Sequence, residues 1–523
     1  MPNSKSNKPA VTKAKVASKK KVAKKPVAKK APVAPVIAPV EAVVETVAKK
    51  KVAKKTVAKK KVAKKTVAKK APVEEVIVEE VIVEEVIVEE VAPVVSWVTQ
   101  TKAELFNKSD TFCVLPWIHL HTTPTGQAAP CCISESCSDN IGVGNSNRDS
   151  LEELVNSPKM KKLRVDMING VKNAECDNCH RHDEKGVPSA RADFNNTWQT
   201  LPKIMDIVKA TEKDGTVKDF KMKYFDIRFS NICNFKCRTC GSAFSSQWEQ
   251  EDIKSKEKTG IPFWAEIVPK GNRQTFLSEI VAQVPNFEIA YFAGGEPLIT
   301  DEHYVLLDYM IKTGNTDIEL RYNSNISNFK YKKKDVFNMW NQFSKPIKIY
   351  ASIDHIGDRA EYIRHGTVWK TIEENFKRIK EERNIKIEVN TVYSIFNAIT
   401  ISHFYKFMID NHYYTPESGI WTLYCMNAPE HLSVHVLPED YKAQADQQLL
   451  LTMQYMRDLG FREDQIQQIE SARTWLNSKH TWAEQSQMFK EELCRLDDLR
   501  GETFEQTFPE LQHLYKKPVS LRP

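Results

Sequence analysis

The sequence lacks, near its start, any apolar run long enough to direct secretion or to span a bilayer. The 523-residue chain opens with Lys-rich repeats and has no early apolar stretch of the about 7–15 residues that a secretory signal needs. In the Glu-rich repeats that follow, the apolar runs are three residues long, far below the roughly 20 residues of a membrane helix. We therefore expect a cytoplasmic protein that does not enter a membrane.

Residues 1–91 also lack Arg and Asp, although they are strongly charged. They hold 23 Lys and 10 Glu, a net charge of +13, whereas the remaining 432 residues hold 53 basic and 58 acidic side chains, a net charge of −5. A Val-Ala-Lys-Lys unit recurs over 22–70 and a Glu-Glu-Val-Ile-Val unit over 74–91, with a period that fits neither a helix nor a strand. Because such repeats bury almost nothing, we predict a disordered tail over 1–95, which either contacts a polyanion or serves as a solubilising spacer.

Beyond the tail, the pattern of apolar residues predicts three further parts. A Cys-rich domain over 96–218 contains a helix near 150–170 that Pro158 divides. Strand-like apolar runs then alternate with amphipathic segments, and the runs cover 224–229, 287–292, 318–322, 347–353, 385–393 and 420–424. Strands that alternate with helices favour parallel β/α units. The expected fold class is α/β, with a partial (β/α)6 TIM-like barrel over 219–430 and a helical region over 431–523.

The eleven cysteines are clustered rather than spread along the chain. Six lie between Cys113 and Cys179, and three lie between Cys233 and Cys240. Because a chain of this length does not need disulfide staples, we interpret the clusters as metal ligands. Cys233, Cys237 and Cys240 follow the first barrel strand and can wrap one face of an iron–sulfur cluster, leaving one iron open. A zinc knuckle that takes its fourth ligand from elsewhere is the alternative.

The pattern Cys-x3-Cys-x2-Cys after a first strand resembles the radical S-adenosylmethionine superfamily. A second match, Phe292-Ala-Gly-Gly-Glu-Pro297, ends the second strand and resembles the family's Gly-Gly-Glu-Pro motif, which binds the methionine amino group of the cofactor. Glycines let the backbone approach a ligand, and a carboxylate offers acceptors to an ammonium group. The resemblance covers about residues 221–425, and the cofactor-binding residues that it implies here are Gly294, Gly295, Glu296 and Pro297.

Weaker matches fall at the ends of the later strands. Asn325 ends an Asn-Ser-Asn segment where relatives often have Thr-Asn-Gly. Ser352 and Asp354 resemble the family's Ser-x-Asp contact to the cofactor ribose, and Arg364 stands where an Arg near the cofactor carboxylate is common. Thr239 departs from the pattern, because the family commonly has an aromatic residue before the third cysteine, and this puts the adenine-side contact in doubt.

The cysteines that precede the barrel resemble auxiliary-cluster modules called SPASM or, in shortened form, twitch. The resemblance implies a second iron–sulfur cluster on Cys113, Cys131, Cys176 and Cys179, with Cys132 as a competitor for the place of Cys131. The later cysteines of the full module are absent, which favours the shortened, single-cluster form.

Two features keep another interpretation of this module open. Such modules normally follow the barrel, whereas these cysteines precede it. His180 and His182 lie beside Cys179, and imidazole suits zinc, so a four-cysteine zinc site is the alternative.

The resemblance implies a radical enzyme that cleaves S-adenosylmethionine reductively at a 4Fe–4S cluster on Cys233, Cys237 and Cys240. The resulting 5′-deoxyadenosyl radical would abstract hydrogen from a peptide or protein, because the auxiliary module accompanies enzymes that modify such substrates. An external one-electron reductant, such as a flavodoxin or ferredoxin, would supply the electron. Hydrogen abstraction needs no general base, so no catalytic acid or base residue is predicted.

Two other functions fit parts of the sequence. One is a radical enzyme that acts on nucleic acid, with the Lys-rich tail as an electrostatic tether. The other is a zinc-stabilised, non-enzymatic binding protein on a barrel scaffold.

Overall fold

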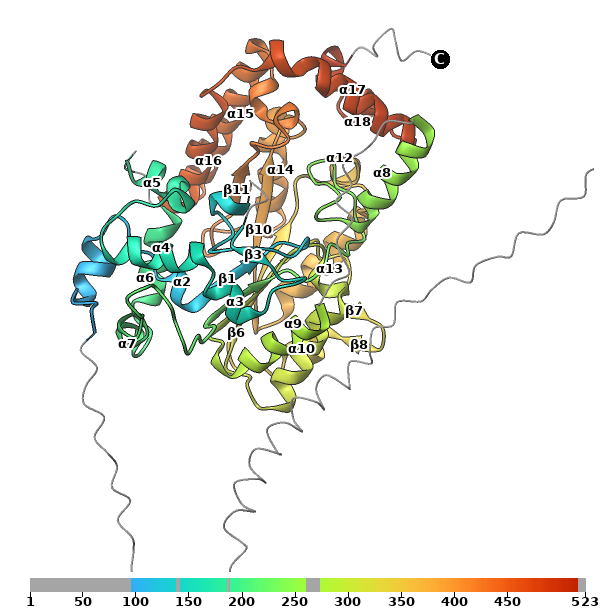
Figure 1. Ribbon diagram of the computed structural model, residues 1–523. Helices are drawn as coiled ribbons and strands as arrows, with labels where there is room; N and C mark the ends of the chain where they lie inside the picture. Colours follow the sequence, from blue (N-terminus) through green and yellow to red (C-terminus); the bar gives the residue numbers. More distant parts are fainter. Residues whose placement is uncertain (1–95, 138–141, 185, 187–188, 260–272, 516–523) are drawn as a thin grey trace, which may run out of the picture.

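The computed structural model describes residues 96–515 except 138–141, 185, 187–188 and 260–272 (Figure 1). The predicted tail over 1–95 lies outside the described residues. The strands are β1 (His119–Thr122), β2 (Gln127–Ala129), β3 (Gly144–Asn145), β4 (Tyr224–Ile227), β5 (Ile289–Phe292), β6 (Glu319–Ser324), β7 (Lys330–Tyr331), β8 (Lys334–Asp335), β9 (Ile347–Ser352), β10 (Ile385–Tyr393) and β11 (Thr422–Cys425). Each of the six predicted barrel runs therefore overlaps a strand.

Helices occupy most of the remaining described chain. They are α2 (Leu115–Ile118), α3 (Leu151–Val155), α4 (Pro158–Ile168), α5 (Asp177–Glu184), α6 (Ala190–Trp198), α7 (Ile204–Lys209), α8 (Ser246–Thr259), α9 (Arg273–Gln283), α10 (Asp301–Lys312), α11 (Val336–Trp340), α12 (Gly357–Ile363), α13 (Trp369–Glu381), α14 (Ile401–Asp410), α15 (Glu439–Asp458), α16 (Glu463–Leu476), α17 (Trp482–Arg500) and α18 (Phe504–Thr507). Pro158 begins α4 at the position where its missing N–H costs nothing, so it divides the predicted helix.

One nine-stranded sheet forms the centre of the molecule, in the order β11-β10-β9-β6-β5-β4-β1-β2-β3. In this order, every neighbouring pair from β11 to β1 is parallel. Beyond β1, the strands β2 and β3 add antiparallel pairs at one edge. The fold is thus a mixed α/β fold with a parallel sheet, as expected. Closure of the six later strands into a partial barrel stays a prediction.

The two faces of the sheet differ in chemistry. Phe225, Leu320 and Ile349 lie on one face, within the main apolar core. The alternate side chains belong to the other face because successive residues of a strand point to opposite sides. That face is polar, and we call it the polar face; it carries Asp226, Tyr291, Arg321, Tyr350 and Asn390.

The Cys-rich segment is not a separate layer but an extension of the same sheet. His119 and His121 of β1 pair in register with Tyr224 and Asp226 of β4. A second apolar core, which includes Trp117, Leu163 and Trp198, fills the space between this extension and its own helices. The sequence pattern predicted a Cys-rich domain with a helix near 150–170, but it did not predict the strands of this segment.

The C-terminal helices α15, α16 and α17, in orange and red in Figure 1, extend over one end of the molecule toward α8. Their apolar residues join the main core, including Leu449, Ile469 and Leu493. Arg500, at the end of α17, pairs with Glu251 of α8 at 2.8 Å. The division of the chain into domains at the predicted boundaries stays a prediction.

Candidate metal and cofactor site

The three-cysteine loop leaves β4 and is held by a second loop that follows α12. The backbone N–H of Lys236 donates to His365 O at 2.9 Å, and that of Arg238 donates to Ile363 O at 2.8 Å. Since these bonds are made by the backbone between the cysteines, they fix the course of the loop before any metal binds.

A single cavity of about 260 Å³ collects the thiols of this loop and most of the predicted cofactor contacts. Its lining comes from the carboxyl ends of β4, β5, β6, β9 and β10, where ligands bind in parallel α/β sheets. The predicted residues in the lining are Cys233, Cys237, Cys240, Gly294, Gly295, Glu296, Asn325, Ser352 and Arg364. Thr239, the departure from the family pattern, also lines it.

The three thiols of the loop are poorly solvated. Burial raises the pKa of Cys240 to about 12 and also raises the pKa values of Cys233 and Cys237. Thiols with such pKa values stay protonated at neutral pH unless a cation takes the place of the proton. The donor set therefore fits a thiophilic metal centre that forms thiolates as it binds.

The Gly-Gly-Glu-Pro turn packs against the cysteine loop. Gly294 has φ +121°, and a Cβ on Gly295 would lie 2.2 Å from the carbonyl oxygen of Ile232. The N–H of Glu296 donates to that same oxygen at 2.7 Å. We expected the glycines to let the backbone approach a ligand, but at Gly295 the close neighbour is the cysteine loop itself.

Glu296 is a buried carboxylate, 2% exposed. It accepts hydrogen bonds from Ser324 Oγ at 2.9 Å, from the N–H of Asn325 at 2.8 Å and from the N–H of Leu298 at 3.2 Å. Burial nevertheless raises its pKa to about 7. A carboxylate offers about four acceptor sites, so one remains for a donor in the cavity.

Arg364 and Asp354 form a buried ion pair beside the cavity. Arg364 Nε lies 2.8 Å from Asp354 Oδ2, and Nη1 lies 3.9 Å from Cys237 Sγ. Asp354 also accepts from the N–H of Val392 at 2.8 Å. Arg364 lines the cavity, whereas Asp354 lies behind it and holds the guanidinium in place.

Two of the predicted cofactor contacts are outside the cavity lining. Pro297 begins a short 3-10 helix, Pro297–Ile299, that Glu296 caps. Asp354 is the second. Contact of Pro297 and Asp354 with a cofactor therefore stays a prediction.

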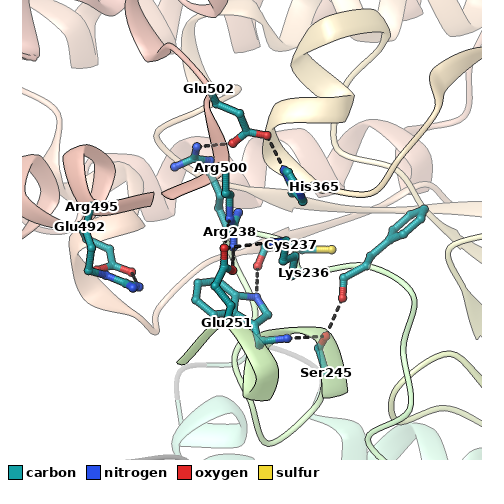
Figure 2. A network of polar contacts seen from close by, with 12 residues as sticks. Lys236, Cys237, Arg238, Ser245, Glu251, His365, Glu492, Arg495, Arg500 and Glu502 are labelled. Carbon is teal, nitrogen blue, oxygen red and sulfur yellow. Dashed lines mark hydrogen bonds and ion pairs between the residues drawn. The ribbon is translucent and has the colours of Figure 1, made fainter. Parts of the chain in front are cut away.

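The C-terminal helices reach the back of the cysteine loop, as Figure 2 shows. The Arg238 guanidinium, 3% exposed, donates to Glu502 Oε2 at 2.5 Å. It also donates to Asp497 Oδ1 at 2.5 Å. It also lies 3.7 Å from the ring centre of Tyr362, whose hydroxyl donates to Asp497 at 2.7 Å. Arg238, which lies between the predicted ligands Cys237 and Cys240, is thus hydrogen-bonded to the C-terminal helical region.

Glu251 of α8 extends this network. It accepts from Lys236 Nζ at 3.0 Å and from Arg500 at 2.8 Å. His365, whose carbonyl accepts from Lys236, pairs through Nδ1 with Glu502 at 2.5 Å. Sequence patterns did not reveal these partners because more than 100 residues separate most of them from the loop and charged residues near a terminus are usually solvated.

The four predicted auxiliary ligands are gathered by the Cys-rich segment. Cys113 and Cys179 are buried, and Cys131 and Cys176 are half-buried. Burial raises the pKa of Cys113 to about 12, and the Cys179 thiol adds to this effect. Burial likewise raises the pKa of Cys176, and the thiols of Cys113 and Cys179 add to it. These four thiols therefore lie close enough to influence one another.

Cys131 and Cys132 differ in their surroundings. After burial, the groups that raise the pKa of Cys131 are Cys132 and the thiols of Cys113 and Cys176. Burial raises the pKa of Cys132 to about 11, and Asp226 is its largest electrostatic neighbour. Cys132 also interacts with Cys179, so the choice of Cys131 as the fourth ligand stays a prediction.

A buried polar group that the sequence did not reveal lies between the two sites. Asp226, 1% exposed, accepts from Arg228 Nε at 3.1 Å and pairs with His121 Nδ1 at 2.9 Å. The Arg228 charge and the hydrogen bond to His121 lower the pKa of Asp226, against the effect of burial. Arg228 lines the cavity of the three cysteines. Only the β1–β4 pairing brings His121 to Asp226.

Two features are absent from the part of the chain that the structure describes. There, no three or more His, Cys, Asp or Glu side chains lie close enough to share one metal ion. Among the same residues, no helix combines the length and apolar character needed to cross a membrane.

The fold is a mixed α/β fold, and one comparison with known proteins matches its Cys-rich segment. Residues 113–180 match the SPASM family, an iron–sulfur cluster-binding domain. With the three-cysteine loop and the Gly-Gly-Glu-Pro turn on one cavity, this match confirms the resemblance to radical S-adenosylmethionine proteins that carry a SPASM domain.

Solved structures give weaker likenesses. SuiB of Streptococcus suis is 16% identical over 58% of this chain and 64% of its own, with a TM-score of 0.30. SuiB bound to S-adenosylmethionine is 14% identical over 58% and 62%, with a TM-score of 0.29. TYW1 with a lysine-pyruvate adduct is 14% identical over 33% and 54%, with a TM-score of 0.18.

The chain spans less than two thirds of the length of each of these three proteins. At such TM-scores we transfer nothing from them to this chain. No curated protein matches the chain.

Proposed function

We propose that the chain is a radical enzyme that binds a 4Fe–4S cluster on Cys233, Cys237 and Cys240 and cleaves S-adenosylmethionine. One observation carries this proposal: three thiols, a buried carboxylate and a half-buried guanidinium line one cavity at the carboxyl ends of parallel strands. When bound, the reduced cluster supplies the electron that splits the sulfonium carbon–sulfur bond and yields a 5′-deoxyadenosyl radical.

The residues present fit this cofactor. Three thiols leave one iron of a four-iron cluster free for a ligand from outside the protein. The remaining acceptor of Glu296 suits the ammonium group of S-adenosylmethionine, and the charge of that group would favour the ionised carboxylate. Arg364 suits the cofactor carboxylate because Asp354 holds its guanidinium at the edge of the cavity.

The protein's own side chains then orient the cofactor and exclude water. Asn325 and Ser352 line the same cavity from β6 and β9 and offer polar groups to the ribose. The Arg238 network keeps the cysteine loop closed from behind. No acid or base side chain is required, because the reaction with the substrate transfers a hydrogen atom.

The SPASM match supports a second, auxiliary cluster, with Cys113, Cys131, Cys176 and Cys179 as its ligands. The same match supports a peptide or protein substrate, because such modules accompany enzymes of that kind. An external flavodoxin- or ferredoxin-like reductant would deliver the electron, and the clustered free thiols suit a reducing, cytoplasmic setting.

Anaerobic purification followed by iron and sulfide analysis tests the proposal, with dithionite and S-adenosylmethionine added to the same sample. We expect about eight irons per chain, for two four-iron clusters, and release of 5′-deoxyadenosine. Cys233→Ala should abolish release, whereas Cys425→Ala, a matched change on β11 outside the cavity, should retain it. Zinc in place of iron, with no release of 5′-deoxyadenosine, would identify a structural metalloprotein instead.

A further inference from the structure

The cavity lining also includes residues that are not assigned to the cofactor. Arg228, Ala293, Asn323 and Val392 contribute to it. Each stands two residues after a side chain of the polar face, and residues two apart in a strand share a face. The polar face therefore forms a floor below these lining residues, and Tyr291 and Arg321 on it are half-exposed although they do not line the cavity.

Two guanidinium groups stand on this floor with hydrogen-bonding capacity left over. Arg228 uses Nε and Nη2 on Asp226, at 3.1 and 3.5 Å. Arg321 uses Nε on Glu319 at 2.6 Å. A guanidinium has five N–H donors, and the described contacts of these two arginines engage only part of them.

Tyr291 lies between the two arginines. It pairs in register with Arg321 across β5 and β6, and neighbouring strands are about 4.8 Å apart. Burial raises the pKa of Tyr291, and the largest electrostatic neighbour acting on it is Arg228. The phenol is therefore protonated at neutral pH and can donate a hydrogen bond.

The charges around this group leave an excess of positive charge. Glu319 also accepts from Lys348 at 2.9 Å, so Arg321 and Lys348 share this carboxylate, while Asp226 pairs with Arg228. Farther along the polar face, Glu388 on β10 interacts with Arg321, Lys348 and Lys386, so four cationic side chains face three carboxylates. His121 is buried, and its pKa is lowered, so it adds no charge at neutral pH.

We propose that Arg228, Tyr291 and Arg321 bind a carboxylate of the substrate, so that the preferred substrate is a peptide with an acidic residue near the site of hydrogen abstraction. The inference rests on the proposed function, because it assigns Glu296 and Arg364 to the cofactor and leaves these three for the substrate. Guanidinium pairs with carboxylate in a bidentate geometry that few other groups match. Asp226 of β4 binds the Arg228 guanidinium, and His121 of the Cys-rich segment binds Asp226, so both are positioning residues.

The test uses the cluster-loaded protein with S-adenosylmethionine and two pools of dye-labelled seven-residue peptides. The pools are identical except that every Asp and Glu of the first is Asn or Gln in the second. Fluorescence anisotropy measures binding, and we expect the acidic pool to bind at least about ten-fold tighter. In Arg228→Met and Arg321→Met this ratio should fall to about one, whereas Arg228→Lys should keep part of it.

Two further variants separate recognition from folding. Arg148→Met removes an exposed arginine outside the cavity and should keep the full preference for the acidic pool. Arg228→Met leaves Asp226 buried without its arginine, so Asp226→Asn combined with Arg228→Met gives the same readout without that unpaired charge. An equal affinity for both pools, or a preference that survives in both Arg228→Met and Arg321→Met, overturns the inference.

Release of 5′-deoxyadenosine without peptide is measured on the same samples and separates the two proposals. If Arg228→Met loses this release, then Arg228 serves the cofactor and the inference is wrong. If the unchanged protein releases 5′-deoxyadenosine but prefers neither pool, the inference alone fails. Displacement of the acidic pool by a single-stranded oligonucleotide at lower concentration than by free acidic peptide would favour a nucleic-acid substrate and overturn it.

Discussion

Arg238 lies between two predicted cluster ligands and donates to Asp497, 259 residues farther along the chain, at 2.5 Å. Both side chains are buried, and Glu502 shares the same guanidinium. The helical region at the end of the chain is therefore part of the support of the cysteine loop. We therefore expect binding of the proposed cluster to depend on residues that carry no recognisable motif.

Arg238→Met should weaken both the fold and the cluster site. The change leaves two carboxylates without their cation, and the loss of one partner of a buried pair costs about 3–5 kcal/mol. We expect a lower unfolding midpoint in urea and about four fewer irons per chain. Arg473→Met removes a more exposed pair with Asp446 and should cost at most about 1 kcal/mol. Normal iron content in Arg238→Met would show that the network does not support the loop.

Gly295→Ala should displace the cysteine loop. Its Cβ would lie 2.2 Å from Ile232 O, so the two loops cannot both keep their places. We expect loss of 5′-deoxyadenosine release by at least ten-fold (about 1.4 kcal/mol) and lower iron content. Gly241→Ala is the matched control. Gly241 follows Cys240 in the cysteine loop, and no atom lies within 4 Å of the Cβ that this change would add. Equal behaviour of the two variants would contradict the packing argument.

Cys131→Ala and Cys132→Ala should separate the two candidates for the fourth auxiliary ligand. Cys131 is influenced by Cys113 and Cys176, whereas the largest electrostatic neighbour of Cys132 is Asp226. We expect Cys131→Ala, like Cys176→Ala, to lower the iron content while cleavage of S-adenosylmethionine continues, and Cys132→Ala to retain all iron. Iron analysis and electron paramagnetic resonance of the reduced protein are the measurements. The reverse result would assign the site to Cys132.

Binding of S-adenosylmethionine should strengthen as the pH rises through about 7. Burial raises the pKa of Glu296 to about 7, so the carboxyl is neutral below that value and ionised above it. The neutral acid cannot pair with the ammonium group of the cofactor, so affinity should rise between pH 6 and 8 and then level off. Glu296→Gln should bind more weakly and lose this dependence. A pH profile that is unchanged in Glu296→Gln, measured by equilibrium dialysis, would remove Glu296 from the ammonium site.

The motifs predicted much of the site because they lie where the chain is locally constrained. Cys233, Cys237 and Cys240 share one loop, and Gly294, Gly295 and Glu296 share one turn, so short-range spacing specifies each group. Alternation of strands and helices brings the ends of parallel strands to one edge of the sheet, which places Asn325 and Ser352 in the same cavity. The Ser-x-Asp pattern was less informative, because spacing did not show that Asp354 turns to Arg364.

The sequence by itself determined the α/β class and the strand positions, and it predicted the cysteine ligands of the loop and the resemblance of residues 113–180 to an iron–sulfur domain, since these depend on residue type and local spacing. Only the tertiary structure decided that β1 joins β4, that Asp497 and Glu502 hold Arg238, and that Arg228 lines the cavity while Arg321 lies farther along the same face of the sheet. Those contacts join residues far apart in sequence. Their pairing depends on which surfaces meet when the apolar cores pack, and no local pattern records that choice.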